Sequence, residues 1–489
     1  MRMRSKLERT QSTPGPGSYG ESPPPKSLLS PEVGCAASLL GLCFSGYIKS
    51  SPLLNWLPLD PTFLFALLCI LSWAGYGIRR NELILKSMLP SVILWATFLP
   101  AAAIAGYLGF DPTKMIYLFS TSFLCVVMPS IIARSYSAQI VWIAGFGAIG
   151  MALGVGVFLF PDRMYFTSLG RIDIEGGTTI ATSRVLGAVA LLAFALIMVP
   201  TTRIYLRVIL LLLAASAVIV MLLIGSRGPV ISLALAVPLV VLTARLSTRA
   251  RLFGLAGLGA MMVVLSRYVS NDQLDQGTAR ILEFLTGDLG DAGRLRLYDL
   301  AVTQSLNNPQ GLGWSGFGEL DLARGFYYPH NIFLEIFVEG GWIAGLAVIA
   351  YVVSAIVKLQ RNSSRGLGLP YYGLAIYWLM ASQFSSDING NRMTWAAVAF
   401  GFAEFAGPMR GLGGGPREGR MEKFSASAAH RPFQSIRFTG SRVKREPFPA
   451  GHQSRNAVPS ALYRHPHQAL RTRPIENGPA RMPARTDHG

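Results

Sequence analysis

Charged residues are scarce in this sequence of 489 residues. They make up 14% of the chain, whereas apolar residues make up 51%, and the mean hydropathy is +0.40. Ordinary soluble domains carry about a quarter charged residues. The composition therefore excludes a wholly soluble protein and favours one with many apolar segments inside a membrane.

Cysteine and histidine are also rare. The four cysteines, Cys35, Cys43, Cys69 and Cys125, lie in or beside apolar segments and form no C-x-x-C pair. We expect them to be small core residues, because no histidine or second cysteine is spaced to share a metal with them. Five of the six histidines follow residue 408, so His330 is the only histidine of the chain's body.

The net charge of +18 could indicate a nucleic-acid binder, but its distribution argues against one. Residues 408–489 hold 15 of the 44 basic residues and only 5 of the 26 acidic ones. This tail has no apolar periodicity and its aromatic residues are scattered, so we expect a disordered basic cytoplasmic extension near anionic lipids and no nucleic-acid partner. Residues 1–30 are polar and rich in Pro and Gly; we expect a disordered cytoplasmic N-terminus without a cleavable signal peptide.

The body, residues 31–407, is a series of apolar segments. A membrane span needs about 20 mostly apolar residues. Twelve segments approach or meet this requirement: 32–48, 62–78, 83–107, 115–133, 138–160, 182–200, 204–224, 229–244, 252–268, 331–357, 371–385 and 393–405. The predicted fold class is an all-α polytopic membrane protein of about 12 transmembrane helices, with a large, partly helical periplasmic loop, 269–330, between the ninth and tenth.

The arginines and lysines of the connecting loops predict the orientation. They gather in alternate loops, at residues 79–80, 134, 203–207, 245–251 and 358–365, and both termini are basic as well. Cytoplasmic loops carry such an excess of positive charge. We therefore expect both termini in the cytoplasm and the long loop on the outer side of the membrane.

The centre of the long loop predicts an amphipathic helix. Between Gly293 and Pro309, one stripe is formed by Leu297, Tyr298, Ala301, Val302, Ser305 and Leu306. Asn307, Asn308 and Pro309 should end the helix. The turn after this helix, 311–318, contains four glycines, which would let its backbone approach a ligand closely.

His330 stands where this loop meets the tenth span. A histidine there can be neutral at pH 7 and accept a proton. Most single histidines are structural, but this one is isolated in the body, lies at the outer interface and follows Pro329, which restricts its approach to the helix. Glu335 and Glu339 follow on the same helix, where buried carboxylates either serve function or pair with an arginine that locks the bundle. The residues leave both readings of the glutamates open.

Arg227 lies in a short external turn, Gly225-Ser-Arg-Gly-Pro229. Pro229 suits the first position of a helix, so Arg227 would stand beside free backbone N–H groups. An arginine at a helix N-terminus can bind phosphate. The alternative is an arginine that reaches out to lipid headgroups.

The outer surface thus combines one possible base with several arginines, and it lacks the close ligand spacing of a metal site. The arginines are Arg227, Arg280, Arg294, Arg296 and Arg324. Three features together favour transfer from a lipid-linked donor. They are arginines that could bind a pyrophosphate, a histidine that could accept a proton, and an apolar helix bundle that could admit a lipid tail. A polytopic membrane transporter is the alternative, which would have ionisable residues paired deep in the bundle and broken helices in both halves. A non-catalytic assembly partner is a third possibility.

Several motifs resemble those of the O-antigen ligase and Wzy-type O-antigen polymerase superfamily. They are Gly225-Ser-Arg-Gly228, Gly293-Arg-Leu-Arg-Leu-Tyr298, Asn308-Pro309, Gly311-Leu-Gly-Trp-Ser-Gly-Phe317, Tyr328-Pro-His-Asn-Ile-Phe-Leu-Glu335 and Glu339-Gly-Gly341. The matched motifs cover roughly 224–345, and the topology covers the body. One departure is Tyr298, which stands where the family commonly has Trp.

The resemblance implies a glycosyltransferase of GT-C-like fold, metal-independent, without cofactor and inverting. It would move a glycan from an undecaprenyl-diphosphate donor to a glycan or lipid A-core acceptor in polysaccharide biosynthesis. The transfer would take place at the periplasmic face of the bacterial inner membrane. By position, His330 would be the base, and Arg227 and Arg294 would hold the pyrophosphate. Arg296, Arg324, Asn331, Glu335 and Glu339 are further candidates for substrate binding. Membrane lipids and proteins of polysaccharide export or chain-length control are the expected partners.

Overall fold

The computed structural model describes residues 30–49, 59–82, 85–159, 164–166, 172–174, 179–224, 226–268, 292–323, 325–364, 367–384 and 386–406. The predictions for residues 1–29, for the whole tail, 408–489, and for the first part of the long loop, 269–291, lie outside these residues. All of the described residues belong to one unit, which spans 1–414.

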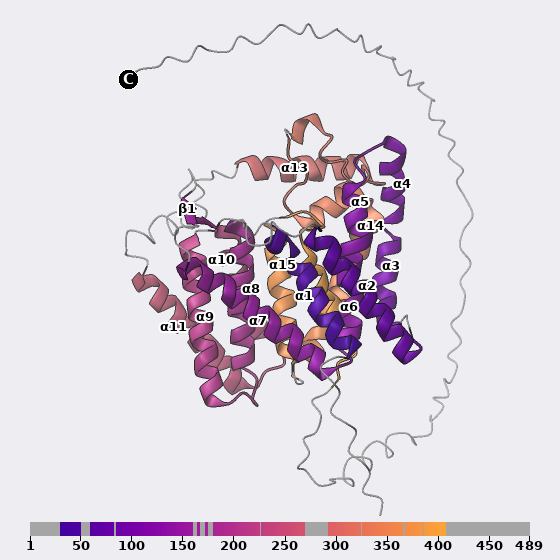
Figure 1. The fold of residues 1–489 in the computed structure, drawn as a ribbon. Helices are drawn as coiled ribbons and strands as arrows, with labels where there is room; N and C mark the ends of the chain where they lie inside the picture. Colours follow the sequence, from indigo (N-terminus) through magenta and orange to yellow (C-terminus); the bar gives the residue numbers. More distant parts are fainter. Residues whose placement is uncertain are drawn as a thin grey trace, which may run out of the picture. The chain divides into compact units, whose positions relative to one another are not determined.

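The described part of the body is a bundle of helices with one short pair of strands (Figure 1). Its first half contains α1 (Pro31–Lys49), α2 (Pro61–Arg80), η2 (Lys86–Met88), α3 (Leu89–Ala96), α4 (Leu99–Leu108), α5 (Thr113–Tyr117), the π-helical η3 (Leu118–Ser122), α6 (Phe123–Ile132), α7 (Tyr136–Leu159) and α8 (Thr179–Ile197). The strands β1 (Met164–Phe166) and β2 (Ile172–Ile174) are antiparallel and lie between α7 and α8.

The second half contains the long loop and its helix. Its elements are α9 (Ile204–Ile224), α10 (Arg227–Thr243), α11 (Thr248–Tyr268), α13 (Ala292–Asn307), η5 (Asp321–Ala323), α14 (Ile332–Asn362), α15 (Gly368–Ala381), α16 (Arg392–Ala399) and η6 (Phe400–Phe402). In Figure 1, α13 lies across one end of the bundle instead of running along it.

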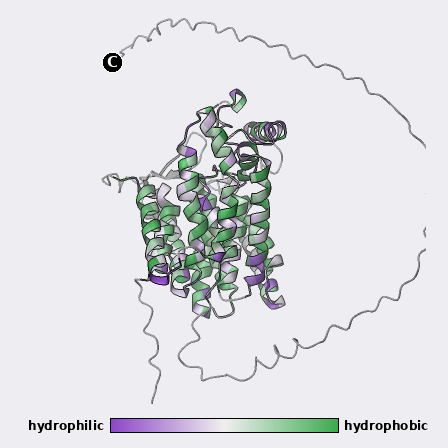
Figure 2. Cartoon of the chain, turned by 90° about the vertical axis from the view of Figure 1, so that its right-hand side faces the viewer, coloured by the Kyte–Doolittle hydropathy of each residue, from purple (hydrophilic) through white to green (hydrophobic). Residues whose placement is uncertain are grey.

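Among the described residues, seven helical segments are long and apolar enough to cross a membrane. They are Pro61–Arg80, Lys86–Leu108, Thr113–Ile132, Tyr136–Val155, Thr179–Ile197, Ile204–Ile224 and Ile332–Asn362. Hydrophobic residues run along the long helices and hydrophilic ones lie mostly near their ends (Figure 2). The chain is therefore a multi-pass membrane protein. The other five predicted spans also hold helices, α1, α10, α11, α15 and α16 with η6, but twelve crossings remain a prediction.

Local signals explain several helix ends. The carboxylate of Asp60 accepts a hydrogen bond of 2.8 Å from the amide of Thr62, and Pro61 occupies the first position of α2, where its missing N–H costs nothing. At the other end, Asn81 adopts a left-handed conformation that terminates the helix. Gly109 ends α4 in the same way, with φ of 72°.

The core consists of large aromatic and aliphatic side chains between α3, α6, α8, α14, α15 and α16. Trp95 packs edge-on against Trp395, with ring centroids 5.3 Å apart. Cys35, Cys69 and Cys125 are buried in this core and none of the four cysteines forms a disulfide. The prediction that they are small core residues is confirmed for these three, and Cys43 is partly buried against the same core.

Two polar clusters mark opposite ends of the bundle. Lys114 and Arg134 flank the two ends of the segment Thr113–Ile132. At the Arg134 end, its guanidinium pairs with Glu82 at 3.1 Å and with Glu404 at 3.4 Å, and Arg80 pairs with Glu32 at 3.2 Å. The Lys114 end carries Glu335 and Glu339, on the helix that begins directly after His330.

Candidate functional site

The loop between α15 and α16, residues 382–391, brings the candidate residues together. The backbone carbonyl of Ser382 accepts a bond of 3.3 Å from the amide of Ile332, at the start of α14. The carbonyl of Gln383 accepts a bond of 3.3 Å from the hydroxyl of Tyr298 on α13. A Cβ atom on Gly228 would lie 2.9 Å from Cβ of Phe384, so the first turn of α10 also packs here. The loop therefore joins the starts of α10 and α14 to α13.

His330 lies at this junction in an unusual backbone conformation. Its φ is +61°, in the left-handed region that few residues other than glycine adopt. Its ring is half-buried beside Tyr328 and Phe326, with centroid distances of 4.6 and 5.8 Å. Burial and the positive charge of Arg294 lower the pKa of the imidazole below its ordinary value. The ring is therefore neutral at pH 7 and able to accept a proton.

Backbone strain is concentrated around the same site. Four described residues other than glycine have positive φ, and three of them, Ser315, His330 and Ser386, belong to the loops that meet here. Strained residues of this kind persist only where the surrounding structure holds them, and they cluster at functional sites. This observation supports a functional role for His330, which its isolation and position in the sequence also favour.

Asn331, directly after the histidine, begins α14. Its side-chain oxygen accepts bonds of 3.0 and 3.1 Å from the amides of Phe333 and Leu334. This is the arrangement of an N-cap. The oxygen of the Asn331 side chain is therefore committed to the helix, although the sequence suggested substrate binding for this residue.

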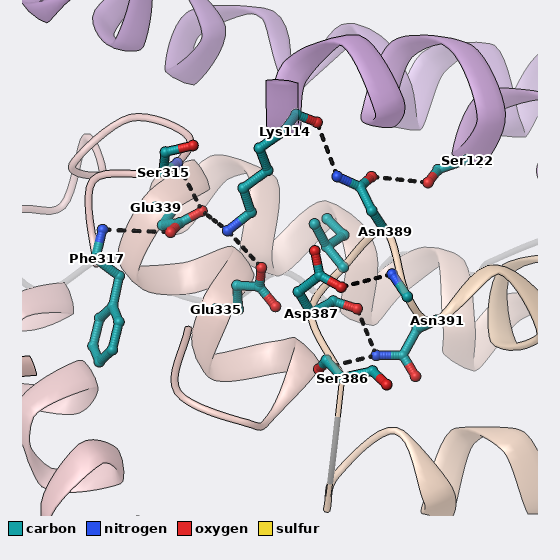
Figure 3. A network of polar contacts seen from close by, with 12 residues as sticks. Lys114, Ser122, Ser315, Phe317, Glu335, Glu339, Ser386, Asp387, Asn389 and Asn391 are labelled. Carbon is teal, nitrogen blue, oxygen red and sulfur yellow. Dashed lines mark hydrogen bonds and ion pairs between the residues drawn. The ribbon is translucent and has the colours of Figure 1, made fainter. Parts of the chain in front are cut away.

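The partner of Glu335 and Glu339 is a lysine from a distant segment (Figure 3). Nζ of Lys114 lies 2.6 Å from Oε1 of Glu335 and 2.5 Å from Oε2 of Glu339. Both glutamates are fully buried. The sequence left a choice between a functional role and a pair with an arginine; the described partner is Lys114, which sequence reasoning did not single out.

Glu339 also holds the glycine-rich turn. Its carboxylate accepts hydrogen bonds from the amides of Ser315, at 3.2 Å, and Phe317, at 3.4 Å (Figure 3). Glu335 has no such donors, and its Oε2 has no hydrogen-bond partner among the described residues. Glu339 thus connects α5 and the turn to α14. Glu335 has Lys114 as its one polar contact among the described residues.

The glycines of the turn serve close packing between backbones. A Cβ atom on Gly311 would lie 2.4 Å from the carbonyl oxygen of Glu339, and one on Gly313 would lie 2.8 Å from the amide of Ala105. Gly341 has φ of +80° and lets α14 kink beside Gln310. We expected these glycines to allow close approach to a ligand; the close approach that the structure describes is to α14 and α4.

The helix α13 confirms the predicted amphipathic segment and corrects its face. It ends at Asn307, as the sequence indicated, and its buried side chains include Leu297, Leu300, Ala301 and Ser305. Val302 and Leu306 were expected on the buried stripe, but they are 45% and 61% exposed. The buried face is therefore rotated away from them, toward Leu300.

The candidate arginines differ in what the structure describes. Arg294 lies on α13, close enough to His330 for its charge to act on the ring. Arg296 is exposed and donates to the carbonyl oxygen of Leu322 at 3.2 Å. The helix α10 begins at Arg227, two residues before Pro229, which the sequence placed at the first helical position. The side chain of Arg227 and the whole of Arg324 lie outside the described parts.

Sequence reasoning missed several polar residues of the junction. Arg184, on α8, is buried and donates to Ser386 at 2.9 Å and to Asn391 at 2.5 Å. Asn389 accepts a bond of 3.0 Å from Ser122 and donates one of 2.9 Å to the carbonyl of Lys114 (Figure 3). A polar residue at the boundary of an apolar segment is the only signal that the sequence offers for them.

Tyr328 was part of a quoted motif but had no assigned role. Burial raises the pKa of its hydroxyl, and the carboxylates of Asp387 and Glu335 raise it further. The hydroxyl therefore keeps its proton at neutral pH and can donate a hydrogen bond beside His330. Within the described residues, no three His, Cys, Asp or Glu side chains are grouped so that they could hold a metal ion.

Residues 210–349 match the family model for O-antigen ligase. The segment carries an O-antigen ligase domain. It includes the arginine turn, the long loop, His330 and both buried glutamates, which confirms the resemblance inferred from the motifs. No curated protein matches the chain. In general terms, a multi-pass membrane protein with an O-antigen ligase domain is a membrane glycan ligase or polymerase.

Proposed function

We propose that the protein transfers a glycan from an undecaprenyl-diphosphate donor to a hydroxyl group of a glycan or lipid A-core acceptor. The observation that carries the proposal is the setting of His330. Its imidazole is neutral, half-buried and close to Arg294, its backbone is strained, and the residue lies inside the O-antigen ligase domain. The protein would act in the bacterial inner membrane, with this end of the bundle facing the periplasm and both termini in the cytoplasm.

In this proposal, His330 removes the proton from the acceptor hydroxyl. The acceptor oxygen forms a bond to the anomeric carbon, and the bond from that carbon to the diphosphate oxygen breaks with inversion. Arg227 and Arg294 stabilise the negative charge that develops on the departing undecaprenyl diphosphate. The proton then leaves the imidazole for water. The step needs no metal and no cofactor.

The proximity of Arg294 to His330 suits both parts of this mechanism. Its positive charge favours the neutral form of the imidazole before the reaction. The same charge would attract the diphosphate, which brings compensating negative charge to the site. Binding of the donor therefore makes the imidazole a stronger base at the moment when it must accept a proton.

The five expected substrate-binding residues now fall into two groups. Asn331 caps α14 and Glu339 holds the glycine-rich turn, so we assign both to positioning of the site. Arg296 and Arg324 remain candidates for contacts with the donor phosphates or sugars. Glu335, with one oxygen unsatisfied and close to Tyr328, remains a candidate for contact with a sugar hydroxyl.

A pair of substitutions at His330 tests the proposal. Asparagine tolerates positive φ better than most residues, so His330→Asn removes the base and keeps the backbone, whereas His330→Ala also adds strain. We expect both variants to lose glycan transfer, and His330→Asn to keep the thermal stability of the unsubstituted protein. His430→Asn, in the tail, is the matched control and should transfer normally. Near-normal transfer by His330→Asn would refute the role of the base.

The acceptor can be identified from the polysaccharides of a deletion strain. Full-length O-antigen that accumulates on the lipid carrier would indicate a ligase. Single repeat units on the lipid A-core would indicate a polymerase. Unchanged polysaccharide together with lost solute uptake would favour a transporter and contradict the proposal.

The positions of the charged groups favour transfer over transport. Lys114, Arg184, Glu335 and Glu339 all lie in the first third of their helices or spans, at the end that carries His330. A transporter would need ionisable groups near the midplane of the bundle. Lipids, the lipid-linked donor and proteins of polysaccharide export or chain-length control are the partners that this function requires.

A further inference from the structure

One face of α13 carries large apolar side chains that the described part of the protein leaves exposed. Leu295, Val302 and Leu306 are 54%, 45% and 61% exposed. Their spacing of seven and four residues places them on one stripe of the helix. The opposite face is already used, because Leu297 and Ala301 are buried there with Val338 of α14. The exposed stripe is thus a second apolar face on the same helix.

The segment beside α13 enlarges this stripe. Leu322, Phe326 and Tyr327 are 64%, 44% and 77% exposed. Arg296 joins the two elements, since its guanidinium donates to the carbonyl oxygen of Leu322. Contiguous exposed apolar residues of this kind indicate an interaction surface. We call the six residues Leu295, Val302, Leu306, Leu322, Phe326 and Tyr327 the apolar ridge.

The apolar ridge is linked to the lipid-facing surface of α14. The indole N–H of Trp342 donates to the carbonyl oxygen of Ser305, next to Leu306, at a distance of 3.0 Å. Trp342 is 42% exposed, and Ile343 and Leu346 beyond it are 73% and 56% exposed on a helix long enough to span the membrane. The apolar surface of the span therefore leads directly onto the end of α13.

Two features favour lipid as the occupant of this surface. Tryptophan is enriched where spans pass from hydrocarbon to headgroups, and Trp342 lies after the kink of α14 at Gly341, where α14 contacts α13. Arg294 and Arg296 lie at the start of α13, with Asp299 as the one acidic residue among the exposed positions of the helix. A helix with an apolar face and basic neighbours is typical of elements that lie in the membrane interface.

We propose that α13 rests in the headgroup layer of the bilayer through the apolar ridge. A lipid-linked donor would then be held at the depth of Arg294 and could reach His330 without leaving the membrane. This consequence rests on the proposed function, whereas the binding of the lipid surface does not.

Site-directed fluorescence tests the contact with lipid. The full-length protein carries a single environment-sensitive dye at Val302→Cys or Leu306→Cys and is reconstituted in vesicles of phosphatidylcholine and phosphatidylglycerol. Ile343→Cys, on α14, is the control for lipid contact, and Glu319→Cys, exposed on the same loop, is the control for water. We expect spin-labelled lipid to quench the dye at positions 302, 306 and 343, and aqueous iodide to quench it at 319.

Two outcomes would overturn the docking. Quenching by iodide at 302 and 306, as strong as at 319, would show that the ridge faces water. Efficient disulfide cross-linking between two copies through Leu306→Cys would show that a second copy of the chain covers it. Both readouts are independent of any enzyme activity.

Kinetics with two donors test the consequence for transfer. The variant Val302→Ser/Leu306→Ser should raise the KM for a long-chain lipid-linked donor in vesicles at least several-fold and leave kcat unchanged. The KM for a short-chain, water-soluble donor should not change. If the variant and the unsubstituted protein had equal KM values for the long-chain donor, the ridge would have no role in presenting that donor. If the unsubstituted protein transfers no glycan, the proposed function fails, and the fluorescence alone decides whether α13 binds lipid.

Discussion

The ammonium group of Lys114 lies 2.5 Å from Oε2 of Glu339, although 225 residues separate the two in the sequence. The same group lies 2.6 Å from Glu335, and both carboxylates are fully buried. One lysine therefore contacts two buried carboxyl groups at the start of α14, four and eight residues after Asn331. The conformation of His330 depends on this cluster, because the cluster fixes the helix that begins directly after the histidine.

Removal of the lysine should destabilise the protein strongly. Lys114→Met leaves two buried carboxylates without a counter-charge, which typically costs about 3–5 kcal/mol. We expect a large fall in the melting temperature, measured in detergent by size-exclusion chromatography after heating. Lys86→Met, at an exposed lysine, is the control.

A second substitution should restore stability unequally. Glu339 keeps two amide donors when Lys114 is absent, whereas Glu335 keeps none that the structure describes. Lys114→Met/Glu335→Gln should therefore recover more stability than Lys114→Met/Glu339→Gln. Equal recovery by the two double variants would contradict the unequal roles of the glutamates.

Gly341 should not tolerate a side chain. Its φ and ψ of 80° and 176° belong to a region that only glycine adopts readily, and a Cβ atom would lie 2.5 Å from the carbonyl of Gln310. Strain of this kind costs about 1–3 kcal/mol before the clash is added. We expect Gly341→Ala to lower the melting temperature and to weaken transfer. Gly106→Ala, where a Cβ atom meets nothing within 4 Å, is the matched control; if both variants melted alike, the turn would not be tightly packed.

The sequence predicted the features that depend on neighbouring residues. Runs of apolar residues indicated a helix in each of the twelve segments, and Asn307 with Pro309 indicated the end of α13. The isolation of His330 pointed to it as the base, a role that stays a prediction. In each case the signal and the structure lie within a few residues of each other, where hydrophobic periodicity and capping act.

Features that depend on distant residues were missed or misplaced. Nothing near Lys114 in the sequence shows that it pairs with Glu335 and Glu339. In the sequence, the junction loop 382–391 has the composition of an ordinary polar connection between α15 and α16. In the structure it also contacts α8, α10, α13 and α14. The prediction that Val302 and Leu306 are buried was wrong. An α-helix with apolar residues on two sides has two possible inner faces, and only its packing against α14 decides between them.

Arg184 should be needed to hold the junction loop. It is 4% exposed, its guanidinium donates to Ser386 and Asn391, and it stacks over Trp378 at 5.1 Å from the ring centroid. Charge-assisted hydrogen bonds contribute about 1.5–3 kcal/mol each. We therefore expect Arg184→Met to lower the melting temperature and transfer, with partial recovery in Arg184→Lys. The control is Arg203→Met, at an exposed arginine; no difference between the two methionine variants would show that the loop holds its shape without Arg184.

The pH dependence of transfer should follow the pKa of His330, which the groups around the imidazole set. Only the neutral imidazole accepts a proton, so activity falls as the pH drops through its pKa. Burial and the charge of Arg294 lower this pKa from its ordinary value of about 6.5, so the acid limb of the rate profile should lie below that pH. Arg294→Gln removes the positive charge, which raises the pKa and moves the acid limb to higher pH. Arg296→Gln makes the same change of charge at an exposed position and should leave the limb in place. A limb that stays fixed in Arg294→Gln, in the profile of kcat/KM for the donor, which reports the free enzyme, would show that the titrating base is not His330 or that Arg294 does not act on it.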